Sequence, residues 1–134
     1  MRVKQVSVFA ENIPGRLVDI LAVLDKKKIS IRALSISETA EFGIVRMVLD
    51  KPDEALEALR ESKFTCRTDW ILGALIPDVP GGLLNTVALP LAGQGINIKY
   101  LYAYIERAEN NRAMVVLKPD DLEKAETILK STIA

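Results

Sequence analysis

The most constraining feature of this sequence is an internal repeat with a period of about 66 residues. Four segments recur in the same order: 13–17 matches 79–83, 29–32 matches 96–99, 47–49 matches 114–116, and 51–54 matches 118–121. The spacing between matching segments changes by only one residue along the chain. A unit of this length is near the lower size limit at which a chain packs a core of its own. We therefore predict two domains in tandem, spanning residues 1–69 and 70–134.

Each repeat carries the same succession of strand and helix signals. In the first repeat, residues 3–9 alternate apolar and polar side chains, as a half-buried strand does. Pro14 suits the first position of a helix, and an apolar stripe at helical spacing follows it: Leu17, Ile20, Leu21 and Leu24. Two β-branched segments around a Gly-containing turn predict a hairpin, and a Lys-Pro-Asp-Glu run opens a second helix. The predicted order is strand 3–9, a helix from Pro14, strands 29–37 and 44–49, a helix from Pro52 and a strand from Phe64.

The second repeat follows this order with two departures. Its predicted elements are strand 70–76, a helix from 81 to about 93, strands 96–106 and 112–117, and helix 119–130. Pro90 falls inside the first of these helices, where a proline costs about 3 kcal/mol unless the helix bends. We expect a kink there. Only residues 131–134 follow the last helix, so the second repeat is predicted to lack its final strand.

The composition excludes several classes of protein. The sequence has no histidine and Cys66 is its one cysteine, which excludes intrachain disulfides, the common zinc sites and histidine-based catalysis. The 18 basic and 18 acidic residues balance, so the charge signature of a nucleic-acid binder is missing. The longest apolar run, 70–77, is far shorter than the roughly 20 residues that span a bilayer, and no signal peptide precedes it. We predict a cytoplasmic protein with no nucleic-acid or membrane partner, no metal and no cofactor.

The two Pro-Gly segments resemble the turn that opens the first helix of an ACT domain. Asn12–Leu17 reads Asn-x-Pro-Gly-x-Leu and Asp78–Leu83 reads Asp-x-Pro-Gly-x-Leu, and each precedes an Ile-x-Ile strand start at matched distance. The resemblance covers essentially the whole chain, twice, and the chain is most similar to the stand-alone tandem ACT proteins. It implies an α+β fold of two ferredoxin-like βαββαβ sandwiches, each an antiparallel sheet with its helices on one face. It also implies a regulatory protein, not an enzyme, that binds an effector, commonly an amino acid, between paired domains.

The resemblance assigns ligand binding to the Pro-Gly turns and to the start of each second strand. The assigned residues are Asn12, Ile13, Pro14, Gly15, Leu17, Ser30 and Ile31 in the first repeat, and Asp78, Val79, Pro80, Gly81, Gly82, Leu83, Asn97 and Ile98 in the second. A helix start offers unpaired N–H groups and a favourable dipole to a carboxylate, and glycine lets the backbone approach it closely. The Asn or Asp side chain can accept from an ammonium. The competing interpretation is that this side chain only caps the helix.

The two predicted sites are not equivalent. Asn12 stands where the second repeat has Asp78, and Ser30 stands where it has Asn97. One site is therefore expected to be empty or to select another ligand. We assign no role to Arg16, because its counterpart is a glycine and an exposed arginine on a helix is common.

The three tyrosines of the chain alternate along one predicted strand. Without a bulge, Tyr100, Tyr102 and Tyr104 share one face of the sheet, and the residues between them make the other face apolar too. A strand that is apolar on both faces is usually buried on both. We interpret these tyrosines as part of a core or an interface and not as a ligand cage.

Pairing of the two repeats through their second strands would strain the short connection near residues 68–71. We therefore favour pairing between chains in a homodimer or larger oligomer, with Asn12 facing Ser30 of a second chain and Asp78 facing Asn97. Pairing of Asn12 with Asn97 inside one chain is the alternative.

The leading hypothesis is an amino-acid sensor. The second is a regulatory subunit that docks on an amino-acid biosynthetic enzyme, as the ACT-bearing small subunit of acetolactate synthase does. An enzyme on the same fold, such as an acylphosphatase, is disfavoured because no glycine-rich phosphate loop is present.

Overall fold

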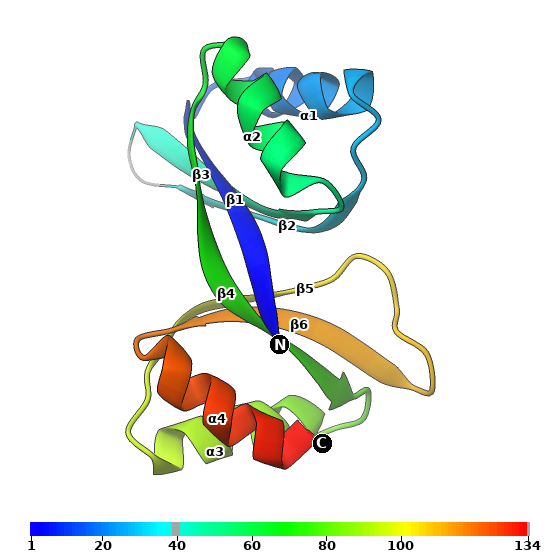
Figure 1. Ribbon diagram of the computed structural model, residues 1–134, viewed down its shortest axis with the longest axis vertical. Helices are drawn as coiled ribbons and strands as arrows, with labels where there is room; N and C mark the ends of the chain where they lie inside the picture. The colour runs from blue at the N-terminus through cyan, green and yellow to red at the C-terminus, as the bar shows by residue number, and fades with distance from the viewer. Residues whose placement is uncertain (39–40, 134) are drawn as a thin grey trace. The chain divides into compact units, whose positions relative to one another are not determined.

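The computed structural model describes residues 1–38 and 41–133, in which six strands, four α-helices and one π-helical turn are found (Figure 1). Their bounds are β1 (Arg2–Glu11), α1 (Arg16–Lys26), β2 (Ile31–Glu38), β3 (Phe42–Leu49), α2 (Pro52–Glu61), β4 (Thr65–Pro77), the π-helical turn η1 (Leu84–Ala88), α3 (Leu89–Gly93), β5 (Ile98–Ala103), β6 (Arg112–Pro119) and α4 (Leu122–Ile133). None of these helices combines the length and the apolar composition needed to span a bilayer.

The chain divides into two units that share two long strands. The first unit comprises Lys4–Asp69, and the second comprises Met1–Val3 together with the chain from Trp70 onward. Strands β1 and β4 each contribute residues to both units. The two strands predicted from Phe64 and over residues 70–76 form one continuous strand, β4.

The first unit is a four-stranded sheet with two helices on one face. Its strand order is β2-β3-β1-β4, and β3 pairs antiparallel with both β1 and β2. Figure 1 shows α1 and α2 lying together over one face of these strands. The core between the layers contains Val6 and Val8 from β1 and Ile20 and Leu24 from α1, all essentially inaccessible to solvent. The alternating strand and the helical stripe of the sequence therefore meet as predicted.

Two polar residues of β1, Gln5 and Ser7, are buried as well, which the half-buried pattern did not predict. Gln5 is fully buried and Ser7 nearly so, on the face of β1 opposite Val6. The side-chain amide of Gln5 donates to the carboxylate of Asp69 on β4 at 3.1 Å. The bond offsets the cost of removing this amide from water.

The second unit repeats the architecture but obtains one of its strands from the start of the chain. Its sheet contains β4, β6 and β5 in that order, all antiparallel, and its core lies between these strands and helices α3 and α4. In the described part of the chain, no strand follows α4. The N–H of Gly73 on β4 instead donates to the carbonyl of Met1 at 2.7 Å, and Arg2 pairs with Glu126 of α4 at 3.2 Å. Met1–Val3 therefore lies beside β4 on the side opposite β6.

The helix that contains Pro90 is irregular, as expected, and the irregularity is a π-helical turn. Residues Leu84–Ala88 form η1, and α3 begins at Leu89 with Pro90 in its first turn. A proline lacks the N–H of an α-helical bond, and its ring collides with the carbonyl four residues earlier. The wider π-helical turn just before Pro90 accommodates both effects.

Strand β5 is shorter than predicted. It ends at Ala103, although Tyr104 still donates its N–H to the carbonyl of Met114 at 2.9 Å. Tyr100 and Tyr102 share one face, with ring centroids 6.5 Å apart, and Tyr102 is buried. Ile105, which falls within the predicted strand 96–106, is 71% exposed because it lies beyond the end of β5.

Candidate functional site

The Pro-Gly turn of the first unit places an uncapped helix start beside a polar side chain. Gly15 occupies the left-handed region at φ 87° and immediately precedes α1, and no side chain caps the helix there. Asn12 instead donates its side-chain N–H to the Glu38 carboxylate at 3.0 Å. Capping by Asn12, the competing interpretation of this turn, is wrong. The first N–H groups of α1 are therefore not satisfied by a side chain.

The Pro-Gly turn of the second unit has the same backbone conformation but different polar contacts. Gly81 has φ 81°; the N–H of Gly82 donates to the carbonyl of Val79 at 2.9 Å, and that of Asn85 donates to the carbonyl of Gly81 at 2.9 Å. Asp78 forms an exposed ion pair with Arg107 at 3.4 Å, and its N–H donates to the carbonyl of Asn111 at 2.8 Å. The carboxylate of this turn is thus paired with a cation, whereas Asn12 is paired with an anion.

The residue after each positive-φ glycine also differs. Gly82 is buried, and a Cβ at this position would overlap the backbone carbonyl of Pro77. The second turn therefore packs against the end of β4. Gly82 was predicted as a ligand residue, and the structure adds an architectural reason for its lack of a side chain.

Ser30 and Asn97 lie in equivalent settings just before the second strand of each unit. The N–H of Ser30 donates to the Asp50 carboxylate at 2.8 Å, and that of Asn97 donates to Asp120 at 3.2 Å. Both side chains are exposed, and neither makes a hydrogen bond to another described residue. Ile31 and Ile98 follow them and pack against the two cores.

Within one unit, the turn and the second-strand residue lie at opposite ends of the sheet. Glu11, before the first turn, pairs with Phe42 at the start of β3, whereas Ile31 pairs with Leu49 at its end. The second unit has the same arrangement along β6. A single unit therefore does not bring Asn12 and Ser30 together, so a site that uses both kinds of residue needs two paired domains.

Apolar side chains are exposed at matching positions around both turns. Ile13 is 45% and Val79 58% exposed, and Val18 and Leu84 at the following helix starts are 67% and 52% exposed. Pro14 and Pro80 are exposed as well, whereas Leu17 packs against the core and Leu83 is 36% exposed. Matching apolar exposure in both repeats favours a surface that another molecule covers.

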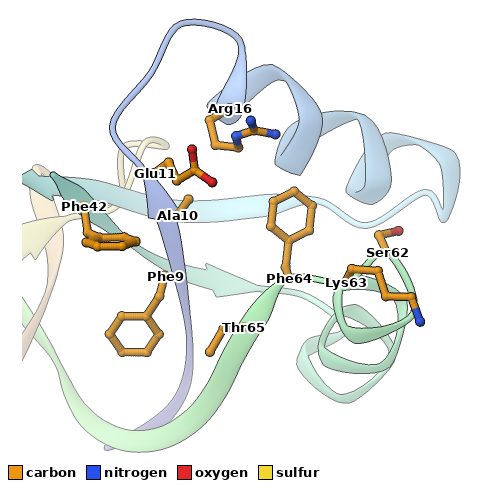
Figure 2. Close-up of a pocket in the computed structure, with 9 residues that line it drawn as sticks. All are labelled: Phe9, Ala10, Glu11, Arg16, Phe42, Ser62, Lys63, Phe64 and Thr65. Carbon is orange, nitrogen blue, oxygen red and sulfur yellow. The ribbon is translucent and has the colours of Figure 1, made fainter.

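The first unit also contains a pocket that the sequence did not predict. It has a volume of about 440 Å³. Figure 2 shows its lining, which comes from the end of β1, the start of α1, the start of β3 and the turn before β4: Phe9, Ala10, Glu11, Arg16, Phe42, Ser62, Lys63, Phe64 and Thr65. Four separate segments supply these residues, so no single motif marks them. The available signal was the contrast between Arg16 and its glycine counterpart, which we interpreted as a sign of no role.

These features define a class of small paired α+β domains whose helix-opening turns are left without a side-chain cap. The chain belongs to the ACT domain family, because the family model of an ACT domain pair matches residues 1–133. The predicted recognition and fold class are thereby confirmed. The family is one of regulatory domains, and no catalytic family is indicated.

Several solved structures are similar to this chain over most of its length. A crystal structure of a protein from Bacteroides thetaiotaomicron is 38% identical, has a TM-score of 0.88, and is matched over 98% of this chain and 88% of that one. The ligand-free regulatory subunit of aspartate kinase from Thermus thermophilus is 15% identical, with a TM-score of 0.66 over 98% and 93% of the two chains. The regulatory subunit of aspartate kinase from Thermus flavus is 16% identical, with a TM-score of 0.62 over 96% and 89%. The likeness to the two kinase subunits concerns the fold. No curated protein matches the sequence.

Proposed function

We propose that this protein is a cytoplasmic regulator that binds a free amino acid at its Pro-Gly turns, between paired domains. The observation that carries the proposal is the start of α1, which follows the left-handed Gly15 and has no side-chain cap; the second turn has a left-handed glycine at the matching position. Such a helix start presents free N–H groups and the positive end of the helix dipole, which together suit a carboxylate.

The ligand's ammonium would be held by the polar side chain of the turn and its partner. In the first turn, the free Oδ1 of Asn12 and the Glu38 carboxylate both attract a cation. In the second turn, Arg107 already neutralises much of the charge of Asp78. We therefore place the stronger ammonium site at the first turn.

The proposed assembly is a homodimer in which paired domains complete each site. Strands β2 and β5 are the edge strands of their units, each hydrogen-bonded along one side only. An open edge can extend a sheet with a strand from a second chain. Such pairing would bring Ser30 or Asn97 of one chain toward a turn of the other, and it would cover the apolar side chains exposed there.

A thermal-shift screen of the twenty amino acids tests the binding proposal. A ligand at 100 times its dissociation constant adds about 2.7 kcal/mol to the free energy of unfolding. We expect at least one amino acid to raise the melting temperature and the effect to weaken in Asn12→Ala. Glu123→Ala, which removes an exposed acid from α4, is the control. If none of the twenty shifts the melting temperature of well-folded protein, the proposal fails.

A second candidate is a regulatory subunit of an amino-acid biosynthetic enzyme. It is favoured by the exposed Leu84 and Leu89 on the helical segments of the second unit, 52% and 54% exposed. A pull-down from native extract would support this candidate if it recovered a biosynthetic enzyme in stoichiometric amount. Recovery of the protein alone as a dimer would support the stand-alone sensor.

A further inference from the structure

The pocket of the first unit contains a buried donor without an acceptor. The Nε of Arg16 is inaccessible to solvent and has no hydrogen-bond partner among the described residues, although its Nη1 pairs with Asp19 at 3.1 Å. Leaving a buried donor unsatisfied costs about 1–3 kcal/mol. Arg16 lines the pocket, so an anionic oxygen bound there could accept from the accessible part of its guanidinium.

An acid lies beside this arginine without being paired to it. Glu11 is exposed and forms no ion pair or hydrogen bond through its side chain within residues 1–38 and 41–133. Figure 2 shows its carboxylate and the Arg16 guanidinium at the same end of the pocket. Adjacent but unpaired opposite charges match a zwitterion, whose carboxylate would meet Arg16 and whose ammonium would meet Glu11.

Three aromatic rings, of Phe9, Phe42 and Phe64, line the pocket together with Ala10, Ser62, Lys63 and Thr65. In Figure 2, the ring of Phe64 points toward Arg16 and Glu11, and Phe42 lies on the other side of Ala10. Phe64 is oriented by the end of α2, because a left-handed Lys63 (φ 71°) lets the Phe64 N–H return to the carbonyl of Leu59 at 3.0 Å. The rings offer an apolar surface, and the pocket volume of about 440 Å³ falls in the range of small-molecule sites.

From these contacts we infer that the pocket of the first unit is a second, separate site for a free amino acid with an apolar side chain. Arg16 holds the carboxylate, Glu11 holds the ammonium, and Phe42 and Phe64 contact the side chain. The site lies within one unit and needs no paired domain. Arg16 lies within the turn Asn12–Leu17, but the other lining residues lie outside both turns, so variants of Glu11 and Phe42 test the pocket separately from the turn.

The second repeat does not offer the same chemistry. The positions that match Phe9, Glu11 and Arg16 hold Leu75, Pro77 and Gly82. Neither charged group has a counterpart there. Each chain would therefore carry one such site.

An NMR titration of the full-length, ¹⁵N-labelled protein tests this inference. The probes are L-leucine, L-phenylalanine, glycine and 3-phenylpropanoate, which lacks the ammonium, and the signals are the side-chain Nε–H of Arg16 and the amides of Ala10 and Phe64. We expect saturable shifts of all three signals with leucine or phenylalanine. Arg16→Met should weaken binding by about tenfold or more, whereas Arg60→Met, which removes an exposed arginine of α2 outside the pocket, should not.

Two further variants separate the assigned roles. Glu11→Gln should weaken phenylalanine but not 3-phenylpropanoate, because only the former carries an ammonium. Phe42→Ala should weaken phenylalanine and leucine more than glycine. Arg16→Lys retains the charge but lacks the planar guanidinium that binds a carboxylate through two donors, so it should bind less tightly than the unmodified protein.

Two results would overturn the inference. One is the absence of any saturable shift of the Arg16 Nε–H signal with all four probes. The other is a set of shifts confined to residues 12–15 and 30 that Arg16→Met leaves unchanged. The latter result would place the ligand at the first turn, so it would support the proposed function while rejecting the pocket.

Discussion

The two Pro-Gly turns share a backbone and differ in what their side chains do. Gly15 and Gly81 have nearly the same φ, 87° and 81°, and each immediately precedes a helical segment. The next residue is Arg16 in one turn and Gly82 in the other. Arg16 lines a pocket, whereas Gly82 packs on the carbonyl of Pro77. The two repeats thus share the backbone of the turn and differ in the space around it.

The charge next to each turn differs in the same way. Asn12 is bound to the anionic Glu38, and Asp78 is bound to the cationic Arg107. If an amino acid binds as proposed, we expect its ammonium to be attracted more strongly to the first turn. The predicted inequality of the two sites has a physical basis in these partners, although the binding itself is a proposal.

The largest expected effect is at Gly82, where the two turns differ most. Gly82→Ala forces a Cβ onto the backbone carbonyl of Pro77, and we expect the free energy of unfolding to fall by about 3 kcal/mol. Gly93→Ala is the control, because no atom lies within 4 Å of a Cβ there. Chemical denaturation of both variants measures the difference. Equal stability of the two variants would show that the second turn is not packed in this way.

The next effect concerns the strand that the second unit takes from the start of the chain. Val3 lies beside Gly73 on β4, so Val3→Asp places a charge against an apolar surface, and we expect a loss of about 2 kcal/mol. Hydrogen exchange should locate the loss in β4 around Gly73. Val18→Asp, at a residue 67% exposed in the first unit, should have little effect. If the exchange at Gly73 stays slow in Val3→Asp, residues 1–3 do not support the second unit.

A smaller and equal effect is expected at the two positive-φ glycines. Gly15→Ala and Gly81→Ala each force alanine into the left-handed region, which costs about 1 kcal/mol. A Cβ at Gly15 meets no atom within 4 Å, and at Gly81 it meets only the flexible side chain of Asn85. Calorimetry should therefore give similar losses. A loss confined to one glycine would mean that the shared backbone conformation is not required in both turns.

The smallest expected effect concerns the thiol of Cys66 in the first unit. Burial raises the pKa of Cys66, and the nearby Arg60 opposes the shift only in part. The stabilisation from keeping this thiol neutral is complete below the pKa of an unfolded cysteine, about 8.5, and is lost as the pH rises above it. We expect the melting temperature to decline at alkaline pH and the decline to be smaller in Cys66→Ala. Identical pH profiles of the two proteins would contradict this.

Most of the secondary structure was predictable from local patterns. The alternation in residues 3–9 and the stripe that includes Ile20 and Leu24 correspond to β1 and α1, because both patterns reflect burial of one face. Pro90 marked an irregular helix, but its form as a π-helical turn depends on tertiary packing. The role of Met1–Val3 was not predictable, since it joins segments some seventy residues apart.

The candidate sites also differ in how far they could be predicted from the sequence. Each turn consists of neighbouring residues in the sequence, and its glycine adopts a left-handed backbone conformation that glycine allows. The geometry of the turns could therefore be predicted from the sequence. The pocket was not, because it gathers Glu11, Arg16, Phe42 and Phe64 from four segments. Its one local sign was an arginine that had no counterpart in the other repeat.

A crystal structure grown with the best amino acid of the thermal-shift screen tests the central claim most directly. The account predicts density for the ligand against the turn Asn12–Leu17, with its carboxylate at the N–H groups of α1 and its ammonium near Asn12 and Glu38. The turn Asp78–Leu83 should be less occupied, because Arg107 neutralises its acid. Density that leaves both turns empty would contradict the claim that these paired ACT domains bind an amino acid there.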